Sequence, residues 1–313
     1  MKDLVKIRQR VYENFPKENL NINTSPIVVT YDIKSDDYNR LVKATQKFLC
    51  KSLSLVYKKE FVWTDTFLED NNNLIINLPN KTPNGILNPK KETVEEFTEI
   101  QTSINNIFNK LNVFNHIKKL AIPNIRYKSV ESEPDEVKSR PYYTGKMHSD
   151  AWVGHKGDSV FLIGVLGDID NNTVEFNNPI GAHDNYLDKA ESFDEGNTRY
   201  DSLEYVGLLQ KQTLAVMDHA CAHKTHIKEG AKPRISIDIA ILIDSPFSHV
   251  NDSGFDEYAY NYYDVSDIKS IGNSKSFTVE ESIFESKKTT LKIKWLKFFQ
   301  ILETLIQILY FLI

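Results

Sequence analysis

Cysteine is scarce in this chain, and so are the features of several protein classes. Its two cysteines, Cys50 and Cys221, lie far apart and belong to no metal or redox motif. We therefore expect free thiols in a reducing compartment and not a disulfide framework. The first fifteen residues are charged throughout and contain no apolar run, so no secretory signal is expected and a cytoplasmic location is predicted.

An excess of basic residues is also missing. With 38 Lys and Arg against 43 Asp and Glu, the formal net charge is −5. Binding to DNA or RNA normally needs a basic face, so no nucleic-acid partner is expected. The shares of hydrophobic (41%) and charged (26%) residues are those of an ordinary globular protein. A chain of 313 residues is long enough for one large domain with extensions, or for two small ones.

Long apolar runs are missing too, with a partial exception at the C-terminus. From Leu291 to Leu312 the apolar side chains follow a roughly seven-residue repeat, and residues 304–313 carry no charge. The uncharged stretch is too short to span a bilayer. Three interpretations remain: a helix docked on the protein, a helix at a membrane surface, or a partner-binding helix. The docked helix is preferred.

Helical periodicity is strongest in the first third of the chain. Residues 35–58 and the segment that begins with the capping-box pair Thr93 and Glu96 both predict amphipathic helices, and a short strand is expected near residues 74–78. After residue 120, β-type runs occur at 122–130, 160–166, 173–176, 213–217 and 235–243. This order predicts an α+β chain with an antiparallel sandwich or barrel in its second part. Residues 177–210 form a long polar connection, a candidate lid.

Histidine and carboxylate are spaced for metal binding in two places. His148 and Asp150 are two residues apart, so an extended backbone points both side chains the same way. Alone, this pair also fits a surface loop. His219, His223 and His226 follow the predicted strand at 213–217. Two imidazoles and one carboxylate form the facial triad that suits Fe(II) and leaves positions open on the metal. We predict His148, Asp150 and His223 as catalytic metal ligands, with His219 second and His226 third as alternatives to His223.

Arg234 opens a predicted strand eleven residues after His223. On that strand Arg234, Ser236 and Asp238 face one way and the intervening isoleucines face the other. An arginine binds a carboxylate through two parallel hydrogen bonds, which a lysine cannot do. We predict that Arg234 holds the far carboxylate of a 2-oxoacid co-substrate, 2-oxoglutarate, with Ser236 donating a second hydrogen bond.

The pattern His148-x-Asp150, His223, Arg234-x-Ser236 resembles the Fe(II)/2-oxoglutarate-dependent dioxygenase superfamily. Within it, the chain looks like the phytanoyl-CoA hydroxylase-like branch, because residues 161–179 resemble the strand–turn–strand that follows the metal loop there. The resemblance covers roughly residues 121–245. It implies Fe(II) and 2-oxoglutarate, with Thr173 and Tyr142 as further co-substrate contacts. Lys224 departs from the pattern, since many relatives have a small residue directly after the distal histidine.

The resemblance also implies the architecture. It predicts a double-stranded β-helix (a cupin-like jelly roll) with supporting N-terminal helices and a C-terminal helical tail. The corresponding division is a mainly helical support region at 1–120, a catalytic core at 121–247, and a C-terminal loop and amphipathic helix at 248–313.

The implied activity is the O2-dependent hydroxylation of a small polar, sugar-like or lipid-linked substrate. Two alternatives stay open. One is a cupin-type metalloenzyme that does not use 2-oxoglutarate, and the other is a non-catalytic β-sandwich binding module with incidental histidines. Arg234-x-Ser236 favours the oxygenase, because an enzyme without 2-oxoglutarate has no need of a clamp for a distant carboxylate.

Overall fold

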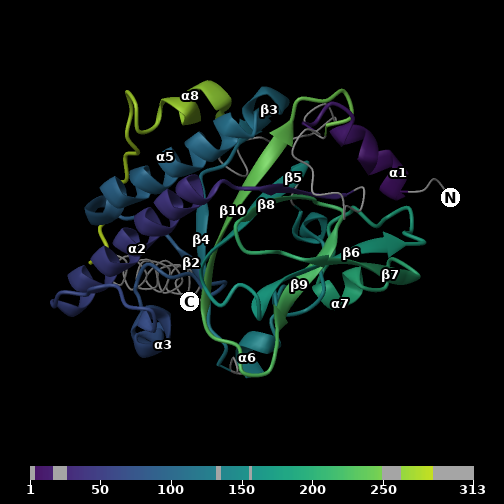
Figure 1. The fold of residues 1–313 in the computed structure, drawn as a ribbon. Helices are drawn as coiled ribbons and strands as arrows, with labels where there is room; N and C mark the ends of the chain where they lie inside the picture. The colour runs from purple at the N-terminus through teal and green to yellow at the C-terminus, as the bar shows by residue number, and fades with distance from the viewer. Residues whose placement is uncertain (1–3, 17–26, 132–134, 155–156, 249–261, 285–313) are drawn as a thin grey trace, which may run out of the picture.

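The fold is seen in a computed structural model that describes residues 4–16, 27–131, 135–154, 157–248 and 262–284 (Figure 1). The α-helices are α1 (Leu4–Gln9), α2 (Ser35–Tyr57), α3 (Phe67–Asp70), α4 (Asn72–Ile76), α5 (Val94–Lys110), α6 (Asp135–Lys138), α7 (Phe193–Gly196) and α8 (Val265–Ser270). The 3-10 helices are η1 (Arg10–Tyr12), η2 (Lys91–Thr93), η3 (Val113–His116) and η4 (Asp150–Val153). The strands are β1 (Val28–Asp32), β2 (Ile86–Leu87), β3 (Ile117–Leu120), β4 (Asn124–Lys128), β5 (Ser159–Gly167), β6 (Asn172–Ile180), β7 (Ser202–Leu208), β8 (Thr213–Asp218), β9 (Ala222–Ile227), β10 (Arg234–Ile243) and β11 (Tyr263–Asp264).

Within these residues the strands form two antiparallel sheets. The larger sheet has the order β1-β8-β5-β10-β3-β11, with β4 also paired to β10 and β2 paired to β4. The smaller sheet has the order β7-β6-β9. The prediction of helices combined with an antiparallel sheet is confirmed. One difference is β1, which comes from the region expected to be mainly helical and yet pairs with β8 along its whole length.

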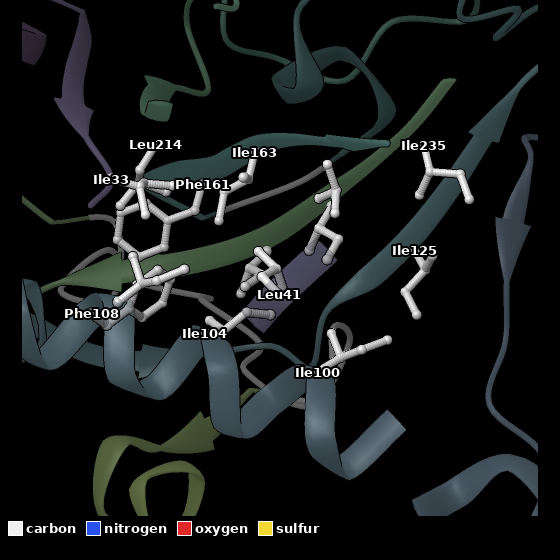
Figure 2. Packing of buried hydrophobic residues seen from close by; sticks show 14 of the residues in the cluster. Ile33, Leu41, Ile100, Ile104, Phe108, Ile125, Phe161, Ile163, Leu214 and Ile235 are labelled. Atoms are coloured by element: carbon white, nitrogen blue, oxygen red, sulfur yellow. The ribbon is translucent and has the colours of Figure 1, made fainter. Parts of the chain in front are cut away.

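Helices α2 and α5 lie side by side over one face of the larger sheet (Figure 1). Figure 2 shows Ile100, Ile104 and Phe108 on one side of α5, turned toward strand residues that include Phe161 and Ile163. This spacing of three and four residues is the one that brings side chains onto a single helical face. Burying a side chain of this size stabilises the fold by roughly 1.5–3 kcal/mol, so this face contributes much of the core.

The opposite face of the larger sheet packs against the smaller sheet. Because side chains alternate along a strand, Val160 and Leu162 of β5 face away from α5. They cluster with Val174 and Phe176 of the smaller sheet and with Met217 of β8. The space between the two sheets is therefore lined from both sides, and the histidines of β9 lie at one edge of it.

Two local expectations differ from the structure. Residues 72–76 form α4 and not a strand, because burial recurs every three residues, at Asn72, Ile75 and Leu78. Residues 177–210 contain the end of β6, the short helix α7 and the strand β7. No residue of β7 is buried, so its sequence lacks the alternation that identifies a half-buried strand.

Three other expectations concern thiols, membranes and the C-terminus. Cys50 and Cys221 are free, as predicted, and burial raises the pKa of both thiols. In the part of the chain that the structure describes, no helix is long and apolar enough to cross a membrane. The apolar repeat at 291–312 lies outside the described residues.

Candidate metal centre

His148, Asp150 and His223 converge at one end of the space between the sheets. Each of the three offers one ligand atom, and these atoms all lie within 4.8 Å of one another. Nε2 of His223 is 3.8 Å from Oδ1 of Asp150, and the two imidazole rings are 4.2 Å apart between centroids. Residues separated by more than seventy positions thus form one compact donor set, of two nitrogens and one oxygen. This is the set predicted from the sequence.

The backbone fixes which nitrogen of each imidazole points to the centre. Nδ1 of His148 donates to the carbonyl of Lys146 at 2.8 Å, and Nδ1 of His223 donates to the carbonyl of Cys221 at 3.2 Å. A carbonyl oxygen only accepts, so Nδ1 carries the proton in each ring and Nε2 keeps its lone pair. Metal-bound histidines are held in their tautomer in this way. The donor set therefore fits a divalent transition metal.

The charge state of His148 fits as well. Its side chain is buried and stacks on the ring of Phe193, with 4.3 Å between the centroids. Burial, followed by the neighbouring His223, lowers the pKa of His148 to about 3. The imidazole is consequently neutral at physiological pH, which is the state that binds a metal.

The two histidines are also linked through their backbones. The N–H of His148 donates to the carbonyl of His223 at 2.9 Å, and the N–H of His223 donates to the carbonyl of His148 at 2.7 Å. Ser149, between the two ligands of the first motif, donates its hydroxyl to the carbonyl of His219 at 2.6 Å. The loop of the first motif is in this way attached to β9 and to the turn before it.

A cavity of about 320 Å³ opens beside this donor set. The three ligands lie on its wall, together with Arg234 and Ser236 from β10. An apolar side is formed by residues of the other strands, which are Val160, Leu162, Val174 and Met217. A larger, more open hollow of about 720 Å³ lies near the end of β5 and contains none of the predicted ligands. The smaller cavity is therefore the candidate site.

Arg234 is a charged side chain of the cavity wall that is only 2% exposed. Its Nε donates to Oδ1 of Asn172 at 3.1 Å, and Nη1 donates to Oγ of Ser236 at 2.5 Å. Among the described residues, no carboxylate forms an ion pair with it. Burial, and then the charge of Arg126, lower the pKa of Arg234 to about 10, so it remains cationic at neutral pH. A buried cation without a counter-ion is costly, and an anionic ligand in the cavity would relieve that cost.

The two weaker candidates are placed differently. Tyr142 lines the cavity, although its hydroxyl donates to the carbonyl of Ala190 at 2.7 Å. Thr173 does not line it. Its hydroxyl donates to the carbonyl of Leu209 at 2.7 Å, on the face of β6 opposite to Asn172 and Val174. Asn172, which orients Arg234, is thus the contact from this strand.

His219 and His226, the two alternatives to His223, lie outside the donor set. His219 lies on the cavity wall but outside the group of three ligands. His226 lies on β9 with its Nδ1 3.1 Å from Oε2 of Glu175. His223 is therefore the histidine that completes the donor set.

Three polar residues of the wall were not singled out as a group in the sequence. Arg126 and Asn124 of β4 both donate to the carboxylate of Asp238 on β10. The sequence indicated only Asp238 as a residue of the wall, since it shares a strand face with Arg234 and Ser236. The contribution of β4 depends on the register between β4 and β10, which the sequence does not reveal.

Comparisons with known proteins give fold likeness alone. No protein-family model matches the sequence, and no curated protein matches it. The non-haem α-ketoglutarate-dependent carbocyclase SnoK from nogalamycin biosynthesis is 10% identical, with 76% of this chain and 84% of that chain covered and a TM-score of 0.40. The epimerase SnoN from nogalamycin biosynthesis is 10% identical, with 77% of this chain and 84% of that chain covered and a TM-score of 0.38. AviO1 from Streptomyces viridochromogenes Tue57 is 11% identical, with 77% of this chain and 95% of that chain covered and a TM-score of 0.38. At these values the likeness assigns neither a family nor an activity to the chain.

Proposed function

We propose that the chain is an Fe(II)- and 2-oxoglutarate-dependent oxygenase that acts on a small polar molecule. In this proposal His148, Asp150 and His223 hold the iron on one face, which leaves about three coordination positions open. Together, bound Fe(II) and 2-oxoglutarate supply the oxidative chemistry: O2 is consumed, succinate and CO2 are released, and one oxygen atom goes to the substrate.

The single observation that carries the proposal is the buried guanidinium of Arg234, which forms no ion pair with any carboxylate that the structure describes. A facial triad alone also serves metalloenzymes that do not use a 2-oxoacid. Such an enzyme has no use for a cation that is 2% exposed and whose hydrogen-bond partners are neutral. A dicarboxylate that reaches from the metal to Arg234 would provide the missing negative charge, which favours the oxygenase over this alternative.

The protein's own part is orientation and exclusion of water. The carbonyls of Lys146 and Cys221 keep both imidazoles in the metal-binding tautomer. Asn172 and Ser236 fix the plane of the Arg234 guanidinium, so its direction is set before the co-substrate arrives. The apolar side chains across the cavity reduce the water around the reacting bond.

A double-stranded β-helix core is part of the same proposal. It is supported by the two antiparallel sheets with the candidate site between them. The proposal also includes the division at residues 120 and 247 and the phytanoyl-CoA hydroxylase-like branch. These finer assignments remain proposals.

Anaerobic spectroscopy tests the function directly. Addition of Fe(II) and 2-oxoglutarate to the protein is expected to give the weak visible charge-transfer band of the chelate. Iron uptake without the band would favour a metalloenzyme that does not use 2-oxoglutarate, and no stoichiometric iron uptake would favour a binding module. Once the band is established, succinate release in air with a panel of small molecules identifies the substrate.

A further inference from the structure

A cluster of three polar side chains lies on the cavity wall beside the predicted 2-oxoglutarate anchor. It consists of Arg126 and Asn124 from β4 and Asp238 from β10, here called the wall cluster. In the antiparallel register Arg126 is opposite Ser236 and Asn124 is opposite Asp238, so all four share one face of the sheet. Arg126 therefore lies level with Ser236 and Asp238 lies four residues along β10 from Arg234, so the wall cluster continues the polar face that Arg234 begins.

The wall cluster is rigid before any ligand arrives. Nε of Arg126 donates to Oδ2 of Asp238 at 2.8 Å, and Nδ2 of Asn124 donates to Oδ1 at 2.8 Å. Nη1 of Arg126 donates to the carbonyl of Asn84 at 3.0 Å, which ties the guanidinium to the chain before β2. Each oxygen of Asp238 accepts one of these hydrogen bonds and keeps a second lone pair, and Nη2 of Arg126 is not used in them, so both groups can still bind a ligand. The Arg126 and Asp238 side chains are 28% and 13% exposed, so both remain reachable.

The wall cluster has no use in the chemistry proposed above. Its three residues are not metal ligands, and Arg234 already supplies the charge for the far carboxylate. Because the wall cluster lines the cavity, its contacts support a role in recognising the substrate that is oxidised together with 2-oxoglutarate.

Charge decides which substrate class the wall cluster fits. Arg126 and Asp238 neutralise each other, whereas no carboxylate of the described residues forms an ion pair with Arg234. If the proposed function holds, the dication and Arg234 are balanced by Asp150 and by the two carboxylates of 2-oxoglutarate. Lys224, a further cation of the wall, is paired with Glu175 at 3.4 Å, so the filled cavity is then neutral. An anionic or cationic substrate would add an uncompensated charge in a confined space, which is unfavourable.

Hydrogen-bonding geometry narrows the class further. A hydroxyl group both donates and accepts. Two adjacent hydroxyls can donate to the carboxylate of Asp238 and accept from the guanidinium of Arg126, with Asn124 beside them. The apolar residues on the opposite side suit a ring whose other face carries C–H groups. We infer that the wall cluster is the recognition element for an uncharged, hydroxyl-rich substrate with adjacent hydroxyl groups, such as a sugar ring. This inference rests on the proposed function for the charge balance of the filled site.

A matched set of three rings tests it. The methyl glycosides of glucose, glucuronic acid and glucosamine present a similar ring with no charge, a negative charge and a positive charge. Calorimetric titrations are done anaerobically on the full chain with Fe(II) and 2-oxoglutarate, after the charge-transfer band has been recorded. The neutral glycoside is expected to bind more tightly than either charged one.

Two nearly isosteric variants then change the charge of the wall cluster in opposite directions. Asp238→Asn leaves Arg126 unbalanced and is expected to move the preference to the glucuronide. Arg126→Gln leaves Asp238 unbalanced and is expected to move it to the glucosaminide. Each variant should weaken binding of the neutral glycoside about tenfold or more, since a hydrogen bond to a charged group is lost. The charge-transfer band should form in both, because neither residue belongs to the proposed iron or 2-oxoglutarate contacts.

Controls separate recognition from damage to the fold. The double variant Arg126→Gln/Asp238→Asn is again neutral and should regain the preference for the neutral ring. Glu99→Gln breaks the exposed ion pair with Lys47 at 2.7 Å, far from the cavity wall, and should change no preference. The inference is overturned if the band forms and no ring binds, if a charged ring binds best to the natural protein, or if the variants leave the order unchanged.

The same titrations on the metal-free protein distinguish the two proposals. An absent band with an intact, charge-dependent ring preference rejects 2-oxoglutarate and keeps the wall cluster as a recognition element. A normal band without the ring preference rejects the wall cluster alone.

Discussion

Arg8 and Asp218 form a buried ion pair that joins helix α1 to β8, the strand that precedes His223. Nε of Arg8 donates to both carboxylate oxygens, at 3.1 and 3.0 Å, and Nη2 is 2.9 Å from Oδ2. Although burial opposes the charged form, Asp218 raises the pKa of Arg8 above its usual value. Asp218 also accepts the backbone N–H of Ala220, in the turn that leads to His223. Helix α1 is therefore connected through Asp218 to the turn that positions His223.

Replacing Arg8 by methionine should both destabilise the protein and weaken metal binding. Loss of one partner leaves the Asp218 carboxylate buried without its cation, which typically costs about 3–5 kcal/mol. Chemical denaturation measures the free energy of unfolding, and anaerobic competition with a chelator measures Fe(II) affinity. Arg10→Met is the control, since Arg10 is 55% exposed and its partner Glu13 is equally open. Equal Fe(II) affinities in the two variants would mean that the ion pair serves stability alone.

Removal of His223 should abolish tight Fe(II) binding, while removal of His219 should not. A direct ligand contributes more than its hydrogen-bond partners, whose loss typically costs about 10–100-fold in metal affinity. In the same chelator competition, we expect the Fe(II) affinity to fall more than about 100-fold in His223→Ala and far less than 100-fold in His219→Ala. The reverse order would make His219 the distal ligand.

Replacement of Arg234 by methionine should weaken 2-oxoglutarate and spare iron. Loss of a buried charge-assisted contact costs roughly 2–5 kcal/mol, so the affinity should fall at least about 30-fold. 2-Oxobutyrate, which lacks the far carboxylate, should bind the variant and the natural protein alike. Titration of the charge-transfer band with both oxoacids measures this. Lys232→Met, two residues away on an exposed side chain paired with Glu69, is the control. If the two oxoacids lose affinity equally, the anchor lies elsewhere.

The stability of the metal-free protein should decline in acid because of His148. The pKa of this imidazole is about 3 in the fold, where burial and His223 lower it, against an ordinary value of 6.5. Between these two values the unfolded chain binds a proton that the folded chain does not. The contribution is complete above about pH 6.5 and is lost progressively down to about pH 3, with a slope of up to about 1.4 kcal/mol per pH unit.

Denaturation curves of the metal-free protein across that range measure the effect. His148→Gln should show a shallower dependence on pH, whereas His183→Gln, on an exposed side chain, should keep the natural slope. Parallel curves for the natural protein and His148→Gln would show that the imidazole is free to protonate in the fold.

The sequence predicted His148, Asp150 and His223 as one group, and the structure brings these three side chains together because their spacing carries the geometry. Ser149 is extended, with φ −107° and ψ 140°, which is why His148 and Asp150 reach the same point. The sequence already preferred His223 to His219, and the structure places His223 on β9 within the group of three while His219 lies in the turn before that strand. The amphipathic helices at 35–57 and 94–110 followed from periodicity, because a helix encodes its buried face locally.

What the sequence did not predict depends on pairing between distant strands. Thr173 and Asn172 are adjacent on β6, and only the register of that strand decides which of them meets Arg234. Arg126 meets Asp238 because β4 lies beside β10, across 112 positions of sequence. A one-residue slip in either strand would exchange the two faces, so sequence patterns alone leave such partners undetermined.

The reciprocal backbone hydrogen bonds between His148 and His223 have a consequence for the choice of cation. They fix the two backbones beside each other, and the Nδ1 hydrogen bonds to the carbonyls of Lys146 and Cys221 orient the rings, so both imidazoles resist displacement by an arriving ion. Asp150 lies just beyond this bridge, at the start of a short 3-10 turn, and a carboxylate can coordinate through one oxygen or two. Accommodation of ions of different size would therefore fall mainly to the carboxylate of Asp150.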